Sequence, residues 1–82
     1  MSAYVLLFKE LEDENVVIYR FGPNEEKTGR IEFNKKTRMF NELESIPAIP
    51  ESTANHYFTY AAKRLTSIIK KGESFPDETF FA

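Results

Sequence analysis

The sequence predicts an α+β protein: an antiparallel three- to four-stranded meander, one long C-terminal helix packed on one face, and an aromatic C-terminal tail. Three observations support this. The front half holds short apolar and β-branched runs separated by polar turns, as in neighbouring antiparallel strands. One later stretch has apolar residues at helical spacing. The last eight residues hold three phenylalanines, unlike a disordered polar tail. The 82 residues are too few for more than one domain, so we expect residues 1–82 to form a single unit.

The predicted strands lie at about residues 3–9, 15–21, 29–34 and 37–43. AYVLLFK and NVVIYRFG are rich in β-branched and aromatic residues, and the acidic segment ELEDEN between them suits a turn. TGRIEFN alternates apolar with polar residues, as a half-buried strand does. TRMFNEL is a weaker candidate that follows the expected turn NKKT. Because the links are short, we expect consecutive strands to pair with one another.

A connector at residues 45–52 separates the strands from the helix, since Pro47 and Pro50 disfavour both helix and central strand. The helix is predicted over about residues 53–71. Ser52 can cap its start, and Gly72 can supply the left-handed residue after its end. One side of this helix is apolar: Ala54, Tyr57, Phe58, Ala61, Leu65, Ile68 and Ile69. The tail then covers residues 73–82.

The first two strands are apolar on both faces, whereas one helix can cover only one face. In the first strand Tyr4, Leu6 and Phe8 point one way, and Val5 and Leu7 point the other. In a simple meander this strand also lies at an edge, without the charge or proline that usually protects an edge. Either the aromatic tail or a second copy of the chain could cover it, and the sequence leaves both open.

This uncovered apolar surface favours a small cytoplasmic protein–protein interaction module without catalysis of its own. The partner would be another protein or a second copy, which would make a homodimer. In an extended tail Phe80 and Phe81 point to opposite sides, so one can fill the domain while the other is left for a partner. The candidate contact residues are Tyr4, Leu6 and Phe8, or Tyr19 and Phe21, whichever set faces away from the helix, together with Phe80 and Phe81.

The alternative function is a nucleic-acid-associated accessory protein that uses a basic helix face. That face would consist of Tyr60, Lys63, Arg64, Lys70 and Lys71. The net charge of −2 argues against a nucleic-acid partner, because dedicated nucleic-acid binders are normally basic.

Catalytic and metal-binding motifs do not stand out. The chain has no cysteine and a single histidine, His56, which falls on the polar side of the predicted helix. The acidic cluster Glu10, Glu12, Asp13 and Glu14 lacks the alternating ligands and central glycine of a calcium loop. GPNEEKTG lacks the order of a phosphate-binding loop. We therefore expect no enzyme, no metal and no cofactor.

The chain shows no sign of membrane insertion or export. No apolar run approaches the roughly 20 residues of a membrane-spanning helix. The start, MSAYVLLFKE, has no cationic lead and too short an apolar run for a signal peptide. We expect no membrane association and a cytoplasmic location.

From Tyr19 onward the chain resembles small bacterial α+β proteins without an assigned activity. The resemblance rests on YRFGPNEEKTGRIEFNKKT, on YAAKRL within the helix, and on the exit KKGESFP with an aromatic end. It implies a fold and no mechanism. One departure is that TRMF follows the turn at a place where the family pattern has a glycine, which affects the turn type.

Overall fold

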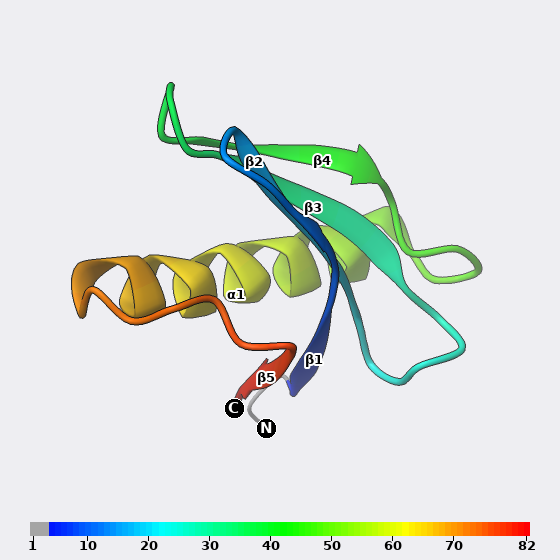
Figure 1. Cartoon of the computed structure of the whole chain (residues 1–82). Coiled ribbons are helices and arrows are strands. Elements are labelled where there is room, and N and C mark those ends of the chain that lie inside the picture. The colour runs from blue at the N-terminus through cyan, green and yellow to red at the C-terminus, as the bar shows by residue number, and fades with distance from the viewer. Residues whose placement is uncertain (1–3) are drawn as a thin grey trace.

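The computed structural model describes residues 4–82, in which one five-stranded antiparallel sheet carries one helix (Figure 1). The elements follow one another as β1 (Val5–Glu12), β2 (Val16–Gly22), β3 (Gly29–Asn34), β4 (Met39–Glu44), α1 (Glu51–Lys70) and β5 (Glu78–Phe81). The order across the sheet is β4-β3-β2-β1-β5. The predicted α+β class is confirmed. The sheet gains a fifth strand because the aromatic tail itself pairs with β1. The predicted start of the first strand at residue 3 lies outside the described residues.

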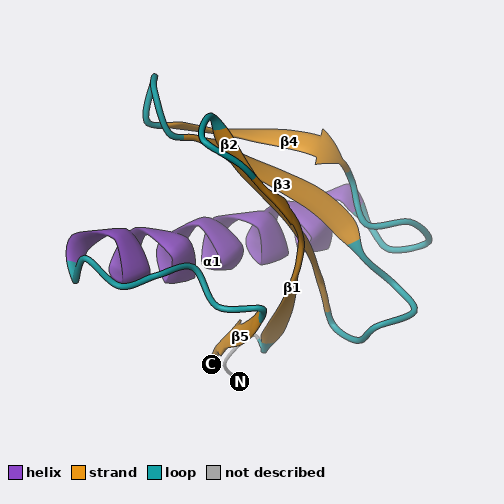
Figure 2. Cartoon of the chain, in the orientation of Figure 1, coloured by secondary structure: helices purple, strands orange, loops and turns teal. Residues whose placement is uncertain are grey.

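The helix covers a single face of the twisted sheet, as Figure 2 shows. It contacts β5, β1, β2 and β3 most closely, whereas β4 is mostly exposed. The core between the two layers contains the inward residues of β1 to β3 and the apolar side of α1. Its fully buried large side chains are Val5, Leu7, Val17, Tyr19, Phe21, Ile31, Leu65 and Ile68.

Helix α1 begins at Glu51, directly after Pro50, and no side chain caps its first turn. The predicted cap at Ser52 is therefore wrong, because the extended residue before the helix is Pro50, two positions earlier, and Ser52 is already helical. The predicted end is confirmed. Gly72 has φ 68°, and the amides of Gly72 and Glu73 donate to carbonyls of the last helical turn.

The turn between β3 and β4 uses Asn34 and Arg38 in place of a glycine. The Asn34 side-chain oxygen accepts the backbone N–H groups of Lys36 and Thr37 at 2.9 Å each. Arg38 then adopts a left-handed conformation with φ 64°. This is the TRMF segment, at which a glycine was expected from the sequence, so here an arginine takes a backbone conformation that favours glycine.

Strand β5 closes the edge of β1 in the same chain. Its register pairs Val5 with Phe81, Leu6 with Phe80 and Phe8 with Glu78. Phe81 therefore shares the inward face of Val5, and Phe80 shares the outward face of Leu6. The C-terminus consequently lies beside the start of β1 (Figure 1). The free edges of the sheet are β4 and the four-residue strand β5.

Candidate interaction surface

An apolar strip crosses the face of the sheet that points away from α1, which we call the outer face. The strip follows β5, β1 and β2 and consists of Tyr4, Leu6, Phe8, Leu11, Ile18 and Phe80. Tyr4, Leu11 and Phe80 are 49%, 46% and 54% exposed, and the other three are half-buried. No element among residues 4–82 covers it, because the only helix lies on the opposite face.

Strand alternation and one irregularity create the strip. Tyr4, Leu6 and Phe8 lie on the outer face because Val5 and Leu7 fill the core. The register of β1 against β2 then shifts between Lys9 and Leu11, which leaves Leu11 opposite Ile18. This β-bulge adds one residue to β1 and returns an apolar side chain to the outer face.

Aromatic contacts order the two ends of the strip. The rings of Tyr4 and Phe80 stack with their centroids 5.7 Å apart and an interplanar angle of 25°. The guanidinium carbon of Arg20 lies 5.4 Å from the ring centroid of Phe8, which it faces across the β1–β2 pair. The cation thus shields one side of Phe8, whereas the Tyr4–Phe80 pair remains half-exposed.

Beyond the strip, the outer face on β3 and β4 is largely polar, with the 62% exposed Met39 on β4 as an apolar exception. Arg30 bridges Glu10 at 2.9 Å and Glu44 at 3.0 Å, and so ties the β1 bulge to β4. Beside it the Asn41 amide donates to the Glu32 carboxylate at 3.1 Å. The apolar strip therefore ends against a border of internally satisfied charges on β3 and β4.

Two charged side chains beside the strip lack the pairing seen on β3 and β4 within residues 4–82. Glu78 on β5 and Arg20 on β2 lie opposite Phe8 on its two sides, in one row across three strands. Neither side chain takes part in an ion pair within residues 4–82. The one polar contact of Arg20 there is a long hydrogen bond of 3.5 Å to the carbonyl of Glu25. Among residues 4–82 the row thus presents one anion and one cation without an ion-pair partner, with an aromatic ring between them.

The structure distinguishes between the candidate contact residues of the two strands. Tyr4, Leu6 and Phe8 face away from the helix. Tyr19 and Phe21 are fully buried beneath it, so they are wrong as candidates for an exposed surface. Phe81 is likewise turned inward, where its ring stacks on Tyr60 with the centroids 5.1 Å apart, whereas Phe80 is 54% exposed on the outer face.

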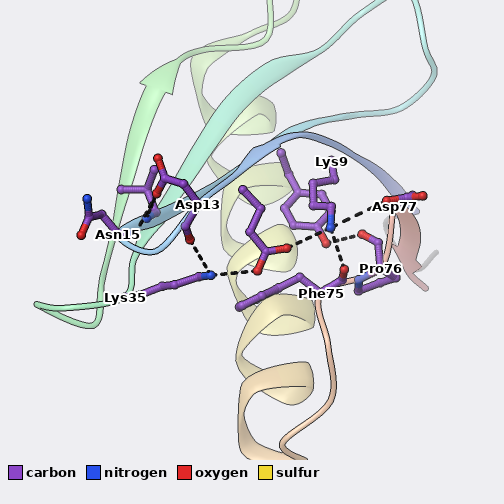
Figure 3. Close-up of polar contacts among 10 residues, drawn as sticks. Lys9, Asp13, Asn15, Lys35, Phe75, Pro76 and Asp77 are labelled. Atoms are coloured by element: carbon purple, nitrogen blue, oxygen red, sulfur yellow. Dashed lines mark hydrogen bonds and ion pairs between the residues drawn. The ribbon is translucent and has the colours of Figure 1, made fainter.

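A polar cluster on the inner side of β1 and β2 fastens the tail to the domain (Figure 3). Lys9 donates to the Phe75 carbonyl at 3.0 Å and lies 3.7 Å from the Asp77 carboxylate. The Tyr19 hydroxyl donates to the Pro76 carbonyl, and the Lys9 amide donates to the Asp77 carbonyl at 2.7 Å. These bonds hold the chain just before β5, so that Phe80 and Phe81 enter the sheet in a defined register.

The charges of this cluster support one another. Glu12 accepts hydrogen bonds from Lys35 at 2.8 Å and Lys9 at 2.9 Å, and both hold its pKa below the ordinary value. The same bond to Glu12 raises the pKa of Lys9. Burial raises the pKa of Tyr19, so its hydroxyl stays protonated and can donate to Pro76. The sequence did not reveal the cluster, because its members are far apart until the tail is placed.

The proposed basic helix face is divided by the tail. Arg64 donates to the Thr79 hydroxyl at 2.8 Å, and the ring of Tyr60 lies between Phe81 and the ammonium of Lys63. Lys63, Lys70 and Lys71 instead border an open groove between α1 and β4. Its volume is about 670 Å³, and Phe40, Phe58 and Ala62 are among its lining residues. The five residues therefore do not form one uniform cationic surface.

The histidine and the acidic residues singled out in the sequence do not form a common site within residues 4–82. His56 is exposed in the second turn of α1. Within residues 4–82 no three His, Cys, Asp or Glu side chains lie close enough to hold a metal ion. In the same part of the chain no helix is long and apolar enough to cross a membrane.

Comparison of the chain with family models, curated proteins and solved structures gave no match.

Proposed function

We propose that the protein is a small cytoplasmic interaction module that binds a protein partner through the outer apolar strip, without catalysis of its own. The observation that supports this most directly is the stacked pair Tyr4–Phe80. Both rings are about half exposed, at 49% and 54%, on a face that no other described element covers. Aromatic side chains dominate the energetics of protein interfaces because they bury a large area with few rotatable bonds.

The surroundings of the strip also support docking. An apolar surface with a polar rim is the usual anatomy of a protein interface. Here the charges on β3 and β4 form that rim, with Arg30 bound to Glu10 and Glu44. Because these charges already satisfy one another, burying the strip does not force them to lose a partner. A partner surface would be apolar at its centre and would present opposite charges to Arg20 and Glu78.

A nucleic-acid-binding role is the weaker alternative. Arg64 and Tyr60, the members best suited to phosphate binding and base stacking, are both engaged with β5. The three lysines that remain lie along an apolar groove, in a chain whose net charge is −2. Phosphate binding would require these lysines to act without a guanidinium or a free aromatic ring.

Site-specific photo-crosslinking in living cells tests the proposed function. A photoreactive phenylalanine analogue replaces Phe80 in one variant and, in the control, Thr59, which is exposed on α1 and lines the groove beside β4. We expect position 80 to give a discrete protein adduct, and position 59 to give none. Mass spectrometry of the adduct identifies the partner as the same chain or another protein. Equal adducts at both positions, or none at position 80, would contradict the proposal.

A further inference from the structure

We infer that the outer apolar strip is self-complementary and binds the same strip of a second copy around a two-fold axis that runs along β1. This inference rests on the proposed function, because it names the partner of the same surface. It depends on how the free charges Glu78 and Arg20 are placed around Phe8.

The arrangement within one copy has a centre and two sides. The outward residues Leu6 and Phe8 of β1, with Tyr4 just before the strand, form a central apolar line. Glu78 lies one strand away on β5, and Arg20 lies one strand away on β2, each opposite Phe8. Neighbouring strands are about 4.8 Å apart, so the two charges are displaced by similar amounts to opposite sides of β1.

A two-fold axis between two facing sheets and parallel to β1 exchanges the two sides. It lays β5 of one copy over β2 of the other. Glu78 of each copy then faces Arg20 of the other, and the pairing occurs twice by symmetry. Facing sheets pack about 10 Å apart, a gap that glutamate and arginine side chains pointing toward each other can bridge.

The charges also exclude the other face-to-face arrangement. A two-fold axis perpendicular to the strands and passing over Phe8 would place Glu78 over Glu78 and Arg20 over Arg20. Like charges facing each other at an interface are unfavourable. Only the axis along β1 joins opposite charges and at the same time brings the central apolar line of one copy onto that of the other.

In the single chain, side chains of the proposed contact are already held in position. The guanidinium carbon of Arg20 lies 5.4 Å from the ring centroid of Phe8, so this cation is held on the outer face before a partner arrives. Phe80 is held by its stack with Tyr4 at 5.7 Å, and the tail-anchoring bonds of Lys9 and Tyr19 fix the register of β5. Without β5 the surface would lack both Glu78 and Phe80.

Edge-to-edge pairing through β5 is the competing mode of self-association. The free edge of β5 is only four residues long, and short edge strands discourage such pairing. In that arrangement the outer faces would lie side by side in one extended sheet. Glu78 and Arg20 would then not face each other, so their charges would hardly affect the association.

Reversing the charges at positions 78 and 20 distinguishes face-to-face association from edge-to-edge pairing. Glu78→Arg alone and Arg20→Glu alone should each weaken dimerisation by about tenfold or more, because each places like charges across the axis twice. An equimolar mixture of the two variants should form heterodimers, since every facing pair is then opposite in charge. The double variant should dimerise nearly as well as the original chain. Sedimentation equilibrium from micromolar to millimolar concentration measures the original chain, the two single variants, their mixture and the double variant.

The controls are Glu73→Arg and Lys36→Glu, which reverse exposed charges outside the strip and should leave the dimer unchanged. Circular dichroism confirms that each variant is folded. The inference is overturned if the original chain stays monomeric throughout, or if the mixture and the double variant associate no better than the single variants. A monomeric chain whose position 80 still crosslinks to another protein would refute the second copy but leave the proposed function intact. Absence of that crosslink as well would refute both.

Discussion

Phe80 and Phe81 are adjacent in the chain but have opposite surroundings. Strand geometry directs them to opposite faces, and the pairing of β5 with β1 decides which face each one takes. Phe81 is half-buried and stacks on Tyr60, whereas Phe80 is 54% exposed beside Tyr4. The sequence predicted the opposition. It did not predict the assignment, because that depends on the register between segments about seventy residues apart.

Serine substitutions at these two positions should therefore have different effects on stability. Phe81→Ser removes a ring packed between α1 and β1, and should lower the free energy of unfolding by roughly 1–2 kcal/mol. Phe80→Ser should change it by only about 0.5 kcal/mol, as exposed substitutions usually do. Urea unfolding at low protein concentration, where association is negligible, measures both. Equal losses would mean that the register of β5 is different.

At the level of elements, β5 turns a vulnerable edge into an interior strand. β1 has the sequence VLLFKELE, and its apolar half would be an open edge without β5. The tail reaches this position through Lys9 and Tyr19, which bind the carbonyls of Phe75 and Pro76. The sequence indicated the open edge and the tail as one possible cover. A second copy at that edge was the other possibility, and the structure places the tail there instead.

A chain that stops after Ser74 should be less stable, because β1 then becomes an open edge of the sheet. The truncation removes Phe75 and Phe81, both packed against the core, together with every backbone hydrogen bond between β5 and β1. We expect a loss of several kcal/mol, comparable with the whole stability of a small domain, and aggregation through the exposed β1. Thermal melting followed by light scattering measures it, with removal of Ala82 alone as the neutral control. Unchanged melting and solubility would mean that β5 contributes nothing to the fold.

At the scale of the whole molecule, the sequence predicted those parts of the fold that depend on local patterns. Alternation and helical spacing gave the first four strands to within a few residues and the apolar side of α1. The tail was predicted as one possible cover for the first strand, but its assignment as a fifth strand needed the structure, because ETFF is too short to be identified apart from its partner. The row formed by Glu78, Phe8 and Arg20 could not be foreseen, since it requires the registers of two separate strand pairs. The groove between α1 and β4 could not be predicted either, because no local pattern in the sequence shows how closely this strand packs on the helix.

Backbone amide NMR spectra recorded during dilution test the central claim, that the outer apolar strip binds a second copy, most directly. From millimolar to micromolar concentration, the shifts should move for Leu6, Phe8, Arg20 and Phe80, and stay constant for groove residues such as Lys71. All moving signals should follow one binding curve, because one interface is responsible for them. Spectra that do not change on dilution, or changes confined to the groove between α1 and β4, would contradict the account.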